Sequence, residues 1–296
     1  MGRVIEDDVE HIVALRFSED GTTLVGADSN GTLFVWGDDF TLRHRLECDL
    51  DIVHDCAFDG RRAVVVGAGD IEVWDVEAGE RVRIIAKPAG HEVQAVTFVG
   101  DRVAAVGDAE ILWLFGDETV ALESFGGERN VSLAFDGTRL VCAAVRQGGS
   151  HVAYAALEGD HLVRVEGPKI AEPTDGMSAI ATSPTGDLMA FTARDLTVFG
   201  FDGAFETNLS PEGNVVVRDA TRGTVERPWS APVFIDAQRV AVGVPGGEVA
   251  VIDVKARQRV ASFVVHGGRD VTAAAFHRGH LVTAGQDYRV VVSELP

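Results

Sequence analysis

The chain has 296 residues, of which 46% are hydrophobic, and its 46 Asp and Glu residues against 26 Lys and Arg residues give a formal net charge of −20 at pH 7. This composition can build a large core and excludes a wholly disordered chain, and the negative charge argues against direct binding of nucleic acid. No apolar stretch approaches the roughly 18 residues of a membrane helix, and the acidic N-terminus lacks the apolar region of a secretory signal, so we expect a cytoplasmic protein without membrane contact.

The basic residues are unusual in kind. Only Lys87, Lys169 and Lys255 are lysines, and all the other cations are arginines. An acidic excess with few lysines is typical of proteins adapted to molar salt, where a Debye length of about 3 Å screens self-repulsion. The composition therefore predicts a halophilic protein; the alternative is an acidic cytosolic protein with arginine-rich usage.

A short segment that alternates polar and apolar residues and ends in an aromatic or small residue recurs along the chain. Consecutive copies start 41, 40, 37, 47, 54 and 40 residues apart. A near-constant period is typical of repeat architectures, in which each unit buries its apolar face against the next. The seven copies start at Val13, His54, Gln94, Val131, Ser178, Pro232 and Thr272.

Each copy continues with the same order of turns and strands. The clearest example is Gly69–Val82, in which one alternating run ends at Trp74-Asp75 and turns at Glu77–Gly79 into another. Four short strands per repeat, with little helical periodicity, is the pattern of a β-propeller blade. We expect an all-β fold: a single seven-bladed β-propeller domain over residues 1–296, with four-stranded antiparallel blades that start near residues 11, 52, 92, 130, 177, 231 and 270.

Several aromatic and histidine residues point to one repeat family. Trp74-Asp75 ends a third strand, Gly90-His91 precedes the third copy, and Trp36 and Trp113 occupy the matching third-strand position. In these residues the sequence resembles the WD-repeat β-propeller family, over essentially the whole chain.

The resemblance implies a structural hydrogen-bond network of His, Ser or Thr, Asp and Trp. In the last copy His266, Thr283 and Asp287 match three of its four members, and Ser293 stands where the family has Trp. Most other copies lack the Gly-His dipeptide, so we expect the network to be only partly preserved.

The two ends of the chain are predicted to pair. The last copy ends at Pro296 after its third strand, and residues 2–7 precede the first copy and belong to no blade of their own. We expect residues 2–7 to form the outer strand of blade seven, because closing the ring removes an exposed edge that invites aggregation.

The fifth copy is longer than the others. We interpret residues 205–230 as an insertion in blade five, in which NVVVRDATRGTVERP is predicted to form an additional or alternative hairpin. Such a segment is either a tolerated surface insertion or a binding element.

The sequence contains no catalytic signature: G-x-S-x-G, HExxH and phosphate-loop patterns are absent. His277 and His280 have HxxH spacing but fall in a tight turn, where we expect solvated side chains rather than a metal site. Cys48, Cys56 and Cys142 include no CxxC pair, which predicts reduced and mostly buried thiols. We therefore expect no enzyme activity, no metal and no cofactor.

The remaining candidates for function lie in the predicted loops. Members of the WD-repeat family most often contact partners through the face that carries the loops between strands four and one and between strands two and three. On this face the repeat pattern places mainly acids in blades one to three and arginines in blades four to seven, which either form an arc suited to carboxylate or phosphate capture or are neutralised by nearby acids. The predicted partner-binding residues are Arg129, Arg146, Arg194, Arg227, Trp229 and Arg269.

These features predict a non-enzymatic platform for protein–protein interaction, a WD-repeat scaffold or adaptor subunit that is monomeric until it binds another protein. Two alternatives stay open. One is a propeller enzyme, or a binder of a small ligand or metal such as Ca²⁺, that uses the central channel. The other is an accessory subunit of an RNA-modifying or other nucleic-acid enzyme, which would bind that enzyme rather than the nucleic acid. Fold alone does not separate these functions.

Overall fold

The computed structural model describes most of the chain, and the regular structure of the described residues is β-strand throughout. The described residues are 2–6, 9–107, 111–123, 125, 129–146, 149–167, 179–183, 188–192, 196–200, 206–209, 217–219, 223–225 and 230–295.

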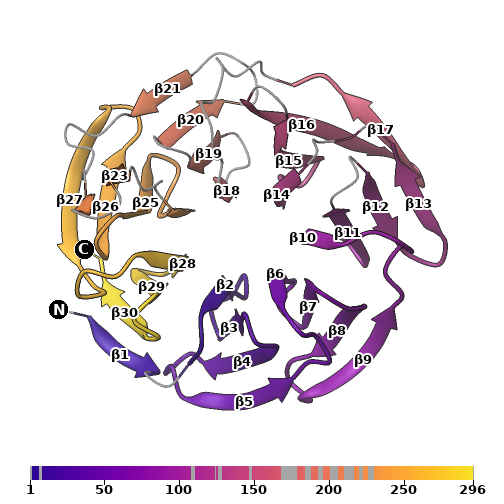
Figure 1. Ribbon diagram of the computed structural model, residues 1–296, viewed down its shortest axis with the longest axis horizontal. Coiled ribbons are helices and arrows are strands. Elements are labelled where there is room, and N and C mark those ends of the chain that lie inside the picture. Colours follow the sequence, from indigo (N-terminus) through magenta and orange to yellow (C-terminus); the bar gives the residue numbers. More distant parts are fainter. Residues whose placement is uncertain are drawn as a thin grey trace.

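The strands of the described residues form seven four-stranded antiparallel sheets and one two-stranded sheet. Figure 1 shows the four-stranded sheets arranged radially around a central axis, each with its first strand nearest that axis. We call these sheets blades one to seven in chain order. The predicted all-β fold of four-stranded antiparallel blades is confirmed.

The first three blades lie in consecutive parts of the chain. From the innermost to the outermost strand they comprise β2 (Ile12–Phe17), β3 (Thr23–Asp28), β4 (Thr32–Gly37) and β5 (Leu42–Glu47); β6 (Val53–Phe58), β7 (Arg62–Gly67), β8 (Ile71–Asp75) and β9 (Glu80–Ile85); and β10 (Val93–Val99), β11 (Arg102–Gly107), β12 (Leu112–Phe115) and β13 (Thr119–Leu122).

The remaining blades follow the same order, except that the outer strand of blade seven comes from the N-terminus. They comprise β14 (Arg129–Phe135), β15 (Arg139–Arg146), β16 (Gly149–Glu158) and β17 (His161–Val165); β18 (Ala179–Thr182), β19 (Leu188–Thr192), β20 (Leu196–Gly200) and β21 (Glu206–Leu209); β24 (Ser230–Phe234), β25 (Arg239–Val244), β26 (Glu248–Asp253) and β27 (Gln258–Val264); and β28 (Val271–His277), β29 (His280–Gly285), β30 (Val290–Glu294) and β1 (Arg3–Glu6). The treatment of residues 1–296 as one domain with the predicted blade starts stays a prediction.

The hydrophobic core is a series of layers between neighbouring blades. In β7, Val65 packs in the layer shared with blade one, whereas Val64 and Val66 pack in the layer shared with blade three. Successive side chains of a strand point to opposite faces of its sheet, so a blade covered on both faces needs consecutive apolar residues. The outer strand β9 has no such cover, and its residues before Ile85 are exposed. Burial on both sides holds the inner strands and the loops between them in place.

The N-terminal strand closes blade seven. β1 runs antiparallel to β30, with Arg3 opposite Val292 and Val4 opposite Val291, and Figure 1 shows the two ends of the chain on the same side of the ring. Ile5 packs against the core layer shared by blades seven and one. The predicted closure by the N-terminal strand is confirmed.

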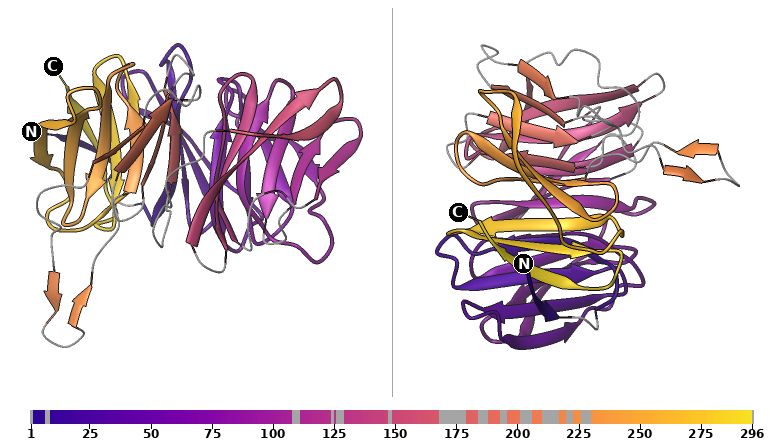
Figure 2. Two further views of the ribbon diagram at one scale, coloured as in Figure 1. Left: turned by 90° about the horizontal axis from the view of Figure 1, so that it is seen from above. Right: turned by 90° about the vertical axis from the view of Figure 1, so that its left-hand side faces the viewer.

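Blade five is followed by a hairpin that belongs to no blade. Among the described strands, β22 (Val217–Asp219) and β23 (Gly223–Val225) pair only with each other, and Figure 2 shows them projecting away from the ring. Glu206–Leu209 also falls in the predicted insertion but pairs with β20 as the outer strand of blade five. The extra sheet is thus shorter than the 205–230 segment, because the start of that segment covers the edge of β20.

Candidate functional site

Two loops of blade seven meet at one edge of the sheet. Residues 265–270 lead into β28 and residues 286–289 connect β29 with β30; they share an edge because Val271 and Gly285 are opposite each other in the sheet. The backbone N–H of Gln286 donates to the carbonyl of Asp270 at 2.9 Å, and that of Arg269 donates to the carbonyl of His266 at 2.8 Å. These bonds fix the two loops relative to each other.

A buried histidine ties the same loops to the sheet. His266 is fully buried, with its Nδ1 at 2.8 Å from Asp287 Oδ1 and its Nε2 at 2.9 Å from Thr283 Oγ1. Because a carboxylate only accepts, Nδ1–H donates to Asp287, and Nε2 of the neutral ring accepts from the Thr283 hydroxyl. The structure therefore brings together the three residues matched to the family network. Ser293 does not complete it, since its buried hydroxyl has no hydrogen-bond partner among the described residues.

Four residues with exposed side chains lie on these loops: Arg269, Gln286, Tyr288 and Arg289. We call Arg269, Tyr288 and Arg289 the blade-seven surface. Tyr288 is 53% exposed and adopts a positive φ of 61°, a backbone conformation that bulky residues rarely take. The guanidinium groups of Arg269 and Arg289, both exposed residues, make no hydrogen bond or ion pair to any residue that the structure describes. Several arginines elsewhere pair with acids, as Arg61 does with Asp75 at 3.0 Å and Arg239 with Asp236 at 2.8 Å.

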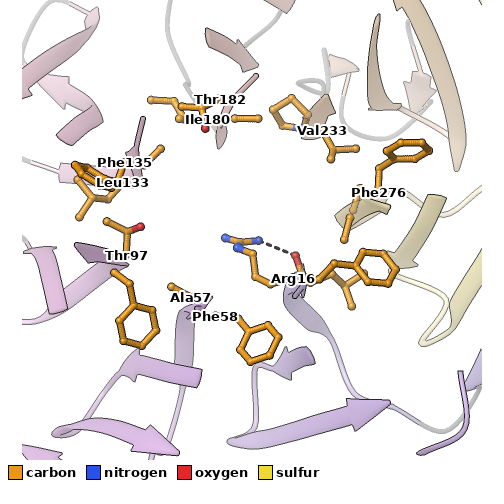
Figure 3. A pocket seen from close by; sticks show the side chains of 18 of the residues that line it. Arg16, Ala57, Phe58, Thr97, Leu133, Phe135, Ile180, Thr182, Val233 and Phe276 are labelled. Atoms are coloured by element: carbon orange, nitrogen blue, oxygen red, sulfur yellow. Dashed lines mark hydrogen bonds between the residues drawn. The ribbon is translucent and has the colours of Figure 1, made fainter. Parts of the chain in front are cut away.

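The central channel is a second candidate. It encloses about 500 Å³ and is lined by the innermost strands of all seven blades. Figure 3 shows the Arg16 side chain reaching into it among mostly apolar neighbours such as Phe58 and Phe135. Arg16 is committed to the protein, because Nη1 donates to the carbonyl of Leu15 at 2.9 Å and Nη2 to Asp55 at 3.3 Å.

The three cysteine thiols, which could act as nucleophiles or metal ligands, are free and mostly buried. Burial raises the pKa of Cys56 to about 12 and also raises the pKa of Cys48 and Cys142, so these thiols are poor nucleophiles at neutral pH. In the part of the chain that the structure describes, no group of three or more His, Cys, Asp or Glu side chains is placed to hold a metal ion.

The HxxH turn differs from its prediction. Arg278 and Gly279, both with positive φ, form a tight two-residue turn that sets His277 opposite His280 on one face of the sheet. The expected solvated side chains are wrong: the His277 ring lies 5.7 Å from that of Phe17, and the His280 ring lies 5.4 Å from that of Phe40. Ring closure causes this, because it places blade one against the end of blade seven.

Comparison with known proteins identifies the fold. The chain superimposes on the β-propeller domain of Myceliophteria thermophila Cps50 (Swd1) with a TM-score of 0.77 over 100% of both chains, at 14% identity. It also superimposes on the computationally designed Ika8 protein with a TM-score of 0.71, at 18% identity, over 99% of this chain and 98% of that one. The fold is a β-propeller. At these identities the likeness is one of fold alone.

The sequence comparisons are less informative about this propeller. No protein-family model matches it. It is 28% identical over 175 residues to Peptidase E of Citrobacter koseri, a match that covers 58% of this chain and 66% of that protein, which is less than two thirds of its length. No helix in the described residues of the propeller has the length and apolar character needed to cross a membrane.

The propeller places the predicted contact residues unevenly. Arg129 begins β14 and Arg146 ends β15 at one edge of blade four, where only their backbones are described. Arg269 is fully described and exposed. The other three predicted residues, Arg194, Arg227 and Trp229, lie outside the described residues.

Sequence reasoning missed Tyr288 and Arg289. Both follow Asp287, which the family resemblance singled out, in the loop between the second and third strands of blade seven. That loop lies on the predicted contact face, so its position was a usable signal. Their exposure was not, because it depends on how the loop is held.

The His266 network predicts a pH dependence of stability. Burial lowers the pKa of His266 in the folded propeller, partly offset by Asp287, so the unfolded chain binds more protons as the pH falls below about 6.5. Protonation therefore favours unfolding. Between about pH 7.5 and about pH 5.5, the wild type should lose more stability than a His266→Gln variant, as measured by urea denaturation at each pH.

Comparing how steeply the free energy of unfolding falls with pH in the wild type and in His266→Gln cancels the contributions of the other titratable groups, which the two proteins share. Equal slopes, or a wild type that gains stability over His266→Gln as the pH falls, would contradict the assignment of a neutral buried imidazole.

Proposed function

We propose that this β-propeller is a WD-repeat protein that acts as a non-enzymatic platform for protein–protein interaction, as a scaffold or adaptor subunit of a larger complex. The observation that carries the proposal is the blade-seven surface, where two loops fixed by hydrogen bonds carry an exposed tyrosine and two arginines whose side chains have no partner among the described residues. Tyrosine and arginine are among the residues that most often dominate binding energy at protein interfaces. Rigid loops lose little conformational entropy when a partner binds.

The proposed contact face is the one that carries the loops between the outer and innermost strands and between the second and third strands. It includes Tyr288 and Arg289 in addition to the residues predicted from the sequence. Support comes from Arg269, which lies on this face, and from Arg129 and Arg146, whose backbones end strands at the corresponding edge of blade four. The proposal extends to Arg194, Arg227 and Trp229 through the repeat pattern alone.

The composition supports a halophilic, cytoplasmic protein. An acidic chain poor in lysine suits the cytoplasm of a cell that keeps molar salt inside. There the propeller would be monomeric until it joins its partner.

Affinity capture from extract of its own cells, kept in molar KCl, tests the function. We expect a stoichiometric protein partner, identified by mass spectrometry, with wild-type propeller. The Arg269→Glu/Arg289→Glu variant should retain about a tenth of it or less, because reversing two anchor charges removes attraction and adds repulsion.

A matched control reverses two exposed arginines away from the contact face. Arg43 lies on outer strand β5, and Arg278 lies in the turn at the opposite end of blade seven. The Arg43→Glu/Arg278→Glu variant should capture the partner as well as the wild type does. Recovery of the propeller without any stoichiometric protein would contradict the platform function.

A further inference from the structure

The blade-seven surface also indicates what chemistry a partner must present. We infer, on the basis of the proposed function, that this surface binds an extended acidic protein segment whose carboxylates contact Arg269 and Arg289 and whose apolar side chain packs on Tyr288.

The charges of the surface set the first requirement. The chain has a net charge of −20, so acids are abundant. Arg62, for example, contacts both Asp59 and Asp101. Arg269 and Arg289 nevertheless have no acidic partner in the described part of the chain. A guanidinium presents its N–H donors as a planar fork that fits a carboxylate. The two arginines are therefore available to carboxylates from another molecule.

The acids of the same loops are held by other groups. Asp287 is hydrogen-bonded to His266, and Asp270 Oδ1 accepts from the backbone N–H of Gly246 in blade six at 2.9 Å. Blade six supports the loop again through the carbonyl of Gly247, which accepts from the backbone N–H of Val265 at 2.8 Å. These contacts direct the loop carboxylates toward the protein. The exposed charged side chains of the two loops are therefore Arg269 and Arg289.

Tyr288 adds an apolar contact to the same surface. The positive φ of Tyr288 is strained for a bulky residue, and such a conformation persists only where surrounding structure fixes it. Here the N–H of Tyr288 donates to the carbonyl of Gly285 at 3.1 Å, and the N–H of Gly285 donates to the carbonyl of Arg289 at 3.3 Å. A half-exposed aromatic side chain on a backbone held in this way provides contact area at low entropic cost.

The size of the charged cluster favours an acidic segment over nucleic acid. A nucleic acid binds more tightly the more of its phosphates the protein neutralises with Lys and Arg side chains. Two arginines on a strongly acidic protein neutralise few phosphates. A short segment needs only two or three contacts. In molar salt, screening over about 3 Å removes the repulsion from distant acids but leaves direct contacts in place.

Isothermal titration calorimetry with defined peptides tests the inference on the full-length propeller. The probe is the peptide GSGELEFELEGSG, and its control is GSGQLQFQLQGSG, in which every Glu is replaced by Gln. The acidic peptide should bind wild type, and the Gln peptide should bind about tenfold or more weakly. Affinity for the acidic peptide should fall about tenfold in Arg269→Glu/Arg289→Glu and about threefold or more in Tyr288→Ala.

Variants separate loss of contact from loss of fold. Arg43→Glu/Arg278→Glu carries the same charge change and should bind the acidic peptide like wild type. Arg269→Lys/Arg289→Lys keeps the charge but loses the fork, so an intermediate affinity is expected. Thermal unfolding of each variant should match wild type.

Several results would overturn the inference. Equal binding of the two peptides would exclude carboxylate recognition, and unchanged binding by the double Glu variant would exclude these arginines. Tighter, arginine-dependent binding of oligo(dT) would assign the surface to nucleic acid, and full displacement by inorganic phosphate would assign it to a small anion. A captured partner that is insensitive to Arg269→Glu/Arg289→Glu would leave the platform function standing while this inference fails; absence of any partner would remove the platform function itself.

Discussion

Deletion of residues 2–6 is expected to lower the free energy of unfolding by about 3–6 kcal/mol and to make the protein prone to aggregation. These residues contain β1, the outer strand of blade seven. The deletion removes the backbone hydrogen bonds between β1 and β30, the packing of Ile5, and the bond from Arg3 Nη2 to the carbonyl of Asp39 in blade one at 3.1 Å. It also leaves β30 as an unprotected edge, which can pair with other chains.

Urea denaturation and light scattering of the truncated protein measure this effect. A synthetic peptide of residues 1–10, added in excess, should restore part of the lost stability by pairing with β30, since strand addition needs only a free edge. Val4→Thr is the matched control, because Val4 is 42% exposed in the same strand and should change stability by about 0.5 kcal/mol or less. Unchanged stability of the truncated protein would show that the closure contributes nothing.

Replacement of Glu72 by alanine is expected to lower the free energy of unfolding by about 3–5 kcal/mol. The Glu72 carboxylate is buried in β8. One oxygen accepts from the backbone N–H of Asp49 at 2.8 Å and from Arg81 at 3.0 Å, and the other accepts from Trp74 Nε1 at 3.0 Å. The variant leaves these donors without their acceptor, and two of them are held in place by packing between blades one and two.

Thermal unfolding should show a drop in Tm on the order of 10 °C for Glu72→Ala. Glu72→Gln should fall between this variant and wild type, because an amide offers one acceptor oxygen in place of two. Glu77→Ala in the same hairpin is the control, since Glu77 is exposed and its loss should matter little. A Glu72→Ala protein within about 1 kcal/mol of wild type would show that the buried carboxylate is replaceable.

Both effects bear on function through the same physical route. Each blade is covered by its neighbours, so a break at the blade-seven closure or at the seam of blades one and two loosens the ring that holds the loops. Loss of the blade-seven closure should affect the blade-seven surface more than the break between blades one and two does. The reason is that β1 pairs with β30, and β30 begins immediately after Arg289. Loss of partner capture in the truncated protein would therefore be expected as a consequence of its reduced stability.

The fold could be predicted from the sequence because each blade is encoded by a local pattern of residues that recurs along the chain. Alternating runs such as Val93–Val99 and apolar runs such as Arg62–Gly67 define strands through side-chain period alone, and turn residues separate them. The recurrence of this order implies a ring, and the unassigned residues 2–7 imply a strand that closes it. The grouping of His266, Thr283 and Asp287 was likewise readable, because all three lie within one repeat.

The details of the candidate site were not readable in the same way, because they depend on contacts between repeats. Glu72 looks like an exposed residue of an alternating strand, but Asp49 and Arg81 enclose it. His277 and His280 look like a solvated turn, but ring closure packs them against blade one.

The same distinction separates what each level determined. The sequence by itself determined the all-β repeat fold, the closing strand and the order of the loops between strands, since these follow from short-range patterns of polarity. Only the tertiary structure decided that the Arg269 and Arg289 side chains have no partner among the described residues, that Tyr288 is exposed and that Glu72 is buried. Pairing and burial are set by residues that lie far apart in the chain and meet only when neighbouring blades stack.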